Sequence, residues 1–164
     1  MQLFETRDEF LDWERATHDV IAVNRCYIDL ADDALAGLFL SQLMYYQTLT
    51  ADGGERLTIE NDGELWLAKK REDWWDECRV SPRQVDRIVK SLRDLGLIET
   101  KTLQFGGVPI MHIRVVWETF LPKVKVVIPT RVDGVINSSV GSRRPLGAQQ
   151  LGTAKLWQVP DDLV

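Results

Sequence analysis

The chain has 164 residues, of which 45% are hydrophobic and 27% are charged, a composition typical of a folded globular protein rather than a disordered one. Its start, MQLFETRDEF, lacks the basic and apolar regions of a secretory signal, and the most apolar stretch, residues 34–46, is too short to span a bilayer. Cys26 and Cys78 match no metal-binding spacing, and two cysteines in a chain without a signal favour a reducing, cytoplasmic location without membrane attachment.

The net charge of −5 argues against a polyanionic partner until its distribution is considered. Residues 1–68 contain 4 Lys+Arg and 14 Asp+Glu, whereas residues 69–101 contain 9 and 7, and residues 102–164 contain 7 and 4. The acidic residues are therefore concentrated in the first part of the chain, and the remainder is mildly basic. A local cationic surface, not the global charge, decides whether phosphate is attracted.

The first part of the chain predicts two helices with an irregular segment between them. Thr6 and Glu9 have the spacing of a capping box, which predicts a short helix from about residue 7 to residue 16. The β-branched residues within 20–30 predict a strand or an extended linker. Asp29 or Asp32 is expected to cap a second helix that ends near Gln47.

The second helix is apolar around its whole circumference, since 11 of the 16 residues in 34–49 are apolar. Such a helix is covered on more than one side. The N-terminal helix of the same chain is one candidate for this cover. The alternative is a second subunit, which makes Ala34–Gln47 a candidate homodimer contact.

The middle of the chain alternates between turn signals and regular elements. Turns at Asp52-Gly53-Gly54 and Asn61-Asp62-Gly63 predict a short hairpin of residues 57–59 and 64–68. A third helix is expected at 70–78, and after a tight turn a fourth at 82–95, with Ser81 as N-cap, Pro82 at the first helical position and Gly96 at the end. Residues 97–105 and 110–117, joined by a loop with two glycines, predict a further hairpin.

Beyond Pro122 the character of the sequence changes. Residues 123–128 (KVKVVI) alternate as one more strand would, and residues 131–152 read as a linker or flexible tail. The apolar segment 156–160 is a candidate to dock on the domain or on a replication or transcription protein. We therefore divide the chain into residues 1–31 (a helix and an extended segment), 32–121 (the main domain) and 122–164 (a strand and a flexible tail).

The helix at 82–95 carries the functional argument. Val85, Ile88, Val89 and Leu92 form one apolar stripe, and Arg83, Arg87, Lys90 and Asp94 fall on the opposite face. The order of helix, short helix, tight turn, capped helix and hairpin is that of a winged helix-turn-helix. We therefore expect an α+β fold: a winged helix-turn-helix with an N-terminal helical extension and a C-terminal tail.

In such a fold the helix at 82–95 enters the DNA major groove, where arginine can bridge guanine and glutamine can pair with adenine. The expected partner is double-stranded DNA. Base readout is assigned to Arg83, Gln84 and Arg87, and phosphate contacts to Ser81 and Lys90. Further phosphate or minor-groove contacts are assigned to Lys69, Lys70 and Arg71 before the third helix and to Lys101 and Gln104 on the hairpin.

Residues 64–114 resemble the winged-helix domains of phage, plasmid and integrative-element proteins, many of them replication initiators or replisome organisers. The segments WLAKKREDWW, SPRQVDR and LRDLGLIE carry the resemblance. It implies recognition of double-stranded DNA, often at a replication origin. By matching position, it implies DNA-facing roles for Arg83, Gln84, Arg87 and Lys90.

The sequence carries no enzyme signature. It has no glycine-rich phosphate loop, nucleophile elbow or metal-ligand pattern, and its histidines are isolated from one another. Helix capping accounts for the acidic cluster near residue 30 more simply than a bound cation does. We expect no catalysis, cofactor or metal, but a sequence-specific DNA-binding protein of a mobile element or its bacterial host, acting in replication initiation or transcriptional regulation. The alternative is an adaptor whose winged helix contacts protein and does not bind DNA.

Overall fold

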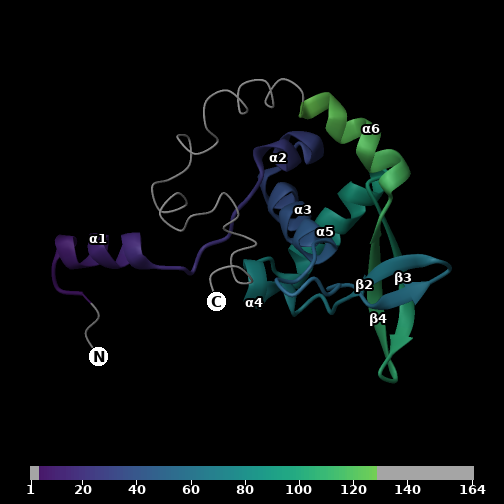
Figure 1. Cartoon of the computed structure of the whole chain (residues 1–164), viewed down its shortest axis with the longest axis horizontal. Coiled ribbons are helices and arrows are strands. Elements are labelled where there is room, and N and C mark those ends of the chain that lie inside the picture. Colours follow the sequence, from purple (N-terminus) through teal and green to yellow (C-terminus); the bar gives the residue numbers. More distant parts are fainter. Residues whose placement is uncertain (1–3, 129–164) are drawn as a thin grey trace.

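The computed structural model describes residues 4–128, which form six helices and a four-stranded antiparallel sheet, so the expected α+β class is confirmed. In chain order the elements are α1 (Arg7–Ala16), α2 (Arg25–Ala31), α3 (Ala34–Gln47), β1 (Ile59–Asn61), β2 (Glu64–Ala68), α4 (Trp74–Cys78), α5 (Pro82–Asp94), β3 (Ile98–Phe105), β4 (Val108–Val115) and α6 (Trp117–Val127). In Figure 1, α2, α3 and α5 cluster beside the sheet, the β3–β4 hairpin projects away from them, and α1 stands apart at the opposite side.

The sheet consists of two hairpins joined side by side, in the order β1-β2-β4-β3. β1 and β2 meet at Asp62-Gly63, whose φ angles of 55° and 76° are those that a two-residue type I′ turn requires. β3 and β4 pair from Ile98↔Val115 to Phe105↔Val108. β2 joins the second hairpin through Leu67↔Ile113 and Ala68↔His112. Both predicted hairpins are thus confirmed, the first with its leading strand two residues later than expected.

The core is built around α3 and α5, which pack against each other. On α5, Val85, Ile88, Val89 and Leu92 are all buried, as the apolar stripe predicts. On α3, the ring of Phe39 stacks on that of Trp74 from α4, with the ring centroids 4.1 Å apart. Apolar side chains from the five helices α2 to α6 and from the sheet therefore share one core, and α5 is held by its apolar face.

α3 is covered within the chain, but by α2, α4 and α5 and not by the N-terminal helix α1 that was the candidate for this cover. Among its residues, Ala34 alone is exposed. Gly37 allows α2 to pack closely, since a Cβ at this position would lie 2.8 Å from the Cα of Ile28. The helix consequently leaves little apolar surface for the homodimer contact considered for Ala34–Gln47.

Two segments predicted as extended are helical. The prediction for residues 20–30 is wrong in its second half, where α2 begins after Asn24 and brings Tyr27 to 6.3 Å from Phe120 of α6, ring to ring. The strand predicted for residues 123–128 is also wrong, since α6 continues to Val127 with Pro122 inside it. Phe120 and Val124, one helical turn apart, are buried, so a helix covers the core better here than an alternating strand does.

Local capping differs in detail from the sequence prediction. Asp33, rather than Asp29 or Asp32, caps α3, because its Oδ2 accepts the N–H of Ala36 at 2.8 Å. Asp32 instead takes a left-handed φ of 52° that ends α2. α4 is shorter than the helix predicted over 70–78, since residues 71–73 form a turn.

Several predictions concern residues beyond 128 and lie outside the described residues: the flexible tail at 131–152, the apolar segment 156–160 and the partner contact assigned to it. Within residues 4–128, none of the helices combines the length and apolar character that a bilayer crossing requires.

Two capping boxes of the same design offer a test of which helices belong to the cooperative fold. Ser81→Ala removes the side-chain oxygen that accepts the Gln84 N–H, and we expect it to lower the free energy of unfolding by about 1 kcal/mol. Thr6→Ala removes the equivalent bond from α1, none of whose residues is buried, and we expect no change in the urea midpoint. Equal losses from both variants would show that α1 is part of the folded core.

Candidate nucleic-acid interface

An open groove of about 760 Å³ separates α5 from the β3–β4 hairpin. The segment before α4 closes one end of it. Its apolar wall consists of Val89 from α5 and residues 108–111 from the hairpin, with Val108 and Pro109 near the tip. Its charged lining residues are Lys70, Arg71, Glu72, Asp86, Lys90, Arg93 and Lys101. Cations therefore outnumber acids in the lining.

The outward face of α5 lies beside this groove and is open to solvent. Arg83 is exposed and has no hydrogen bond or ion pair among residues 4–128. Arg87 has a side chain 53% exposed, with its Nη2 3.5 Å from Oδ2 of Asp33. Lys90 pairs with Asp94 one turn further along, at 2.7 Å. Lys90 belongs both to this face and to the groove, so the two surfaces are continuous.

Ser81 and Gln84 hold each other at the start of α5. The Ser81 Oγ accepts the Gln84 N–H at 3.3 Å, and the Gln84 Oε1 accepts the Ser81 N–H at 2.9 Å. This confirms Ser81 as the N-cap. The predicted pairing of Gln84 with adenine uses the amide oxygen and nitrogen together. Because the amide oxygen already accepts the Ser81 N–H, this pairing requires Gln84 to leave the capping box.

The hairpin places its two predicted residues differently. Lys101 is half-buried, with Nζ 2.8 Å from Oδ2 of Asp62 and 4.9 Å from the ring centroid of Trp66. The hydrogen bond from Lys101, and then its charge, lower the pKa of the Asp62 carboxyl. Gln104 is exposed near the tip. Lys101 thus contributes charge to the groove from a fixed position, while Gln104 remains available to a partner.

Lys70 and Arg71 lie at the end of the groove, as phosphate contacts would. Lys70 is exposed, and Arg71 pairs with Asp86 of α5 at 2.8 Å across the groove. That pair is about half exposed on both sides. Pairs of this kind contribute about 0–1 kcal/mol, so an incoming phosphate can displace Asp86 at little cost.

Lys69 is the correction among the predicted contacts, because its side chain is only 9% exposed. Its ammonium group pairs with Glu77 of α4 and donates to the Tyr46 hydroxyl at 3.3 Å. Glu77 also accepts hydrogen bonds from Tyr46 at 2.5 Å and Gln42 at 2.9 Å. Burial, and then the neighbouring Glu77, raise the pKa of Tyr46 far above its usual range. Lys69 therefore joins the sheet to α3 and α4 and is not placed to meet phosphate.

One groove residue was missed by the sequence prediction. Arg93 lines the groove with no hydrogen bond or ion pair from its side chain among the described residues. It lies one heptad after Asp86, and this spacing places both on the flank of α5 next to Val89. The helix face was recognisable in the sequence, but the position of the predicted hairpin beside it was not.

Comparisons of the chain with models of protein families, with curated proteins and with solved structures found no match. Among residues 4–128, no three His, Cys, Asp or Glu side chains gather in a way that suits a metal ion.

Glu77→Gln tests the structural role of Lys69. The substitution leaves a mostly buried ammonium group without its countercharge, and we expect the free energy of unfolding to fall by about 2–4 kcal/mol in urea titrations. Glu72→Gln removes an exposed carboxylate from the same segment and serves as the control with no expected loss. A small effect of Glu77→Gln would mean that the Lys69 ammonium reaches water and is available to a ligand.

Proposed function

We propose that this chain is a winged-helix protein that binds double-stranded DNA with α5 in the major groove. The order α3, β2, α4, α5, β3, β4, with β2 paired to β4, supports this assignment. A winged helix consists of a helix-turn-helix followed by a two-stranded hairpin, which is the wing.

The connection between α4 and α5 fits a helix-turn-helix turn. Residues 79–81 separate the two helices. Arg79 takes the left-handed conformation, with a φ of 59°, and Val80 is fully buried beneath the turn. Turns of three or four residues with one left-handed position are typical of this motif, although glycine is the more common occupant.

The observation that carries the proposal is the exposure of the α5 cations next to a cationic groove. Arg83 and Arg87 point away from the buried stripe and lie near the N-terminal end of α5, the part of a recognition helix that reaches base edges. Lys70, Lys90, Arg93 and Lys101 then lie where the flanking phosphates would run. Lys90 and Lys101 are paired with exposed carboxylates, those of Asp94 and Asp62, which phosphate can replace at little cost.

Binding by this surface positions a DNA site and then recruits or excludes other proteins. We propose a role in replication initiation or transcriptional regulation in a mobile element or its bacterial host, on the resemblance of residues 64–114 to the winged-helix domains of such proteins. The net charge of −5 does not oppose this, since the acidic residues are concentrated before residue 69 and cations outnumber acids among the residues that line the groove.

A protein adaptor is the second candidate, and Trp75 is the observation that favours it. Its side chain is 49% exposed on α4, where the Arg79 guanidinium lies over the ring and Glu72, Asp73 and Asp76 are neighbours in sequence. An exposed tryptophan beside a surplus of carboxylates suits a basic protein surface better than DNA. An adaptor of this kind would show no affinity for duplex DNA at any salt concentration.

The base-reading role is tested with Arg83→Ala/Arg87→Ala. After selection of bound fragments from random duplex DNA, we expect the double variant to bind the selected sequence about a hundredfold more weakly or worse by fluorescence anisotropy. Its melting temperature should be unchanged, because both side chains are exposed. Arg25→Ala/Lys125→Ala removes the same charge from exposed positions on α2 and α6 and should bind normally. Equal affinity of the two double variants would reject the proposed face.

The phosphate-contacting role is tested through salt dependence. We expect Lys70→Ala and Arg93→Ala each to reduce the slope of log affinity against log salt by about one, with the preferred sequence unchanged. The slope comes from anisotropy titrations at several salt concentrations. A change in the selected sequence, with an unaltered slope, would place these residues against bases rather than phosphates.

A further inference from the structure

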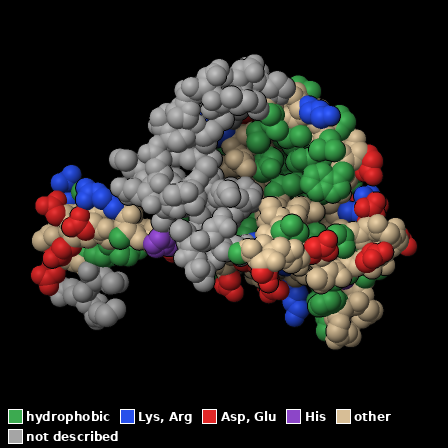
Figure 2. Space-filling model, in the orientation of Figure 1, with side chains coloured by type: hydrophobic (Ala, Val, Ile, Leu, Met, Phe, Trp, Pro, Cys, Tyr) green, Lys and Arg blue, Asp and Glu red, His purple; other side chains and the backbone are tan. Residues whose placement is uncertain are grey.

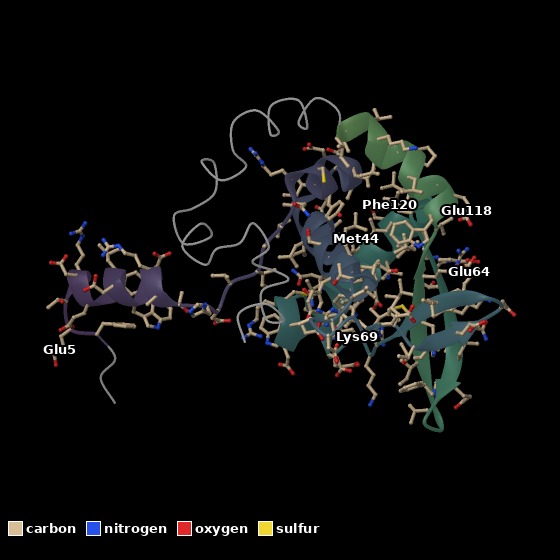
Figure 3. The ribbon with its side chains drawn as sticks, in the orientation of Figure 1. Glu5, Met44, Glu64, Lys69, Glu118 and Phe120 are labelled. Atoms are coloured by element: carbon tan, nitrogen blue, oxygen red, sulfur yellow. The ribbon has the colours of Figure 1, made fainter. Side chains whose placement is uncertain are left out.

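α1 is a well-formed helix that makes no contribution to the core. Thr6 and Glu9 form its capping box, the Thr17 N–H bonds to the Trp13 carbonyl at its end, and none of its residues is buried. Residues 17–24 connect it to α2 without forming a helix or strand. Figures 1 and 3 show α1 on the opposite side of the molecule from the β3–β4 hairpin. A helix of this length is marginal in water when it has nothing to pack against.

One side of α1 is an aromatic ridge. The rings of Phe4, Phe10 and Trp13 contact one another, with centroids 5.4–5.8 Å apart. Phe10 and Trp13 remain 44% and 45% exposed. At 100° per residue, Glu9 and Glu14 flank these rings on either side. The rest of α1 carries further acidic side chains together with Arg7 and Arg15, which pair with Asp8 and Asp12 (Figure 2). The helix thus presents apolar rings between carboxylates, an arrangement that DNA would repel.

The groove beside α5 has the complementary arrangement. Val89 and the hairpin residues 108–111 supply an apolar wall, and Lys70, Lys90 and Arg93 supply cations along its edges. The aromatic rings of α1 can be buried on the apolar wall of the groove, and the carboxylates beside the rings are opposite in charge to the cations along the groove. Figure 1 places α1 far from the hairpin of its own chain, so the matching groove is that of another copy.

We propose that α1 of one copy docks into the α5–hairpin groove of a second copy, with Phe10 and Trp13 on the apolar wall and Glu14 near Arg93. Reciprocal exchange of the two arms gives a closed dimer, in which each copy both donates and receives a helix. α1 and a DNA duplex would compete for the same cations. The groove is therefore covered in the dimer and unavailable to DNA until the dimer dissociates. The dimerisation itself does not depend on the proposed function, since it is measured without DNA.

Sedimentation equilibrium of the full chain in low salt measures the dimer directly. We expect the wild type to dimerise with an affinity that weakens as salt is added, and Phe10→Ser/Trp13→Ser to be monomeric at the same concentrations. Both rings lie outside the core, so the fold is retained. Val126→Ser removes an apolar side chain that is 77% exposed on α6 and serves as the matched control.

A charge exchange separates this dimer from other modes of association. Glu14→Arg and Arg93→Glu each place like charges together in both contacts of their own homodimer, and we expect each to dimerise about tenfold more weakly. A mixture of the two variants restores both contacts in the heterodimer, which should form with wild-type affinity. If the mixture dimerises no more tightly than the separate variants, Glu14 and Arg93 do not meet across the contact, and the proposal is overturned. A monomeric wild type would also overturn it, while the duplex titrations would stand as a separate test of the proposed function.

Discussion

Burial of one face of α5 determines where the cations of the candidate interface lie. Val85, Ile88 and Leu92 are fully buried against the core. Exposing a single side chain of this size costs about 1.5–3 kcal/mol. Rotation of α5 by one residue would move the whole stripe by 100°, at a cost comparable with the stability of a small domain. Arg83 and Arg87 therefore face outward because the opposite side of the helix has to stay buried in the core.

Burial also divides the cations of this region into two kinds. The Lys69 ammonium is shielded from solvent and contacts Glu77, Tyr46 and the ring of Trp74. Moving its charge toward an external phosphate would therefore break a mostly buried network. Arg71, in contrast, meets its carboxylate partner in solvent, where the exchange of one anion for another is nearly neutral. The first kind holds the sheet to the helices. The second kind is available for binding.

Features set by neighbours along the chain could be predicted from the sequence. Ser81 and Pro82 marked the start of α5, its apolar stripe marked its buried face, and Asp62-Gly63 marked a two-residue turn. These signals depend on residues a few positions apart. Local chemistry is sufficient to interpret them, because capping and turn geometry are satisfied by the segment itself.

Features set by distant partners could not be predicted in this way. Lys69 and Lys70 are adjacent cations, yet one is buried because Tyr46 and Glu77 converge on it from α3 and α4. β-branched and apolar residues in α2 and α6 suggested strands, since packing between these two helices is not visible in a short alternating run. For the same reason Arg93 was overlooked, because its role depends on a hairpin that folds back beside α5.

The two ends of α5 are not equivalent. At its C-terminal end, the Nζ of Lys123 from α6 donates to the carbonyl of Leu95 at 2.5 Å, and Thr119 lies against Gly96, where an added Cβ would come within 3.2 Å. α6 thereby satisfies and covers the negative end of the helix dipole. The positive end is capped only by its own Ser81 and Gln84, and the neighbouring Pro82 and Arg83 are exposed, so the two ends of α5 differ. If the chain binds duplex DNA as proposed, a single copy has one orientation along the duplex and contacts an asymmetric site, and an inverted repeat of that site requires a second copy.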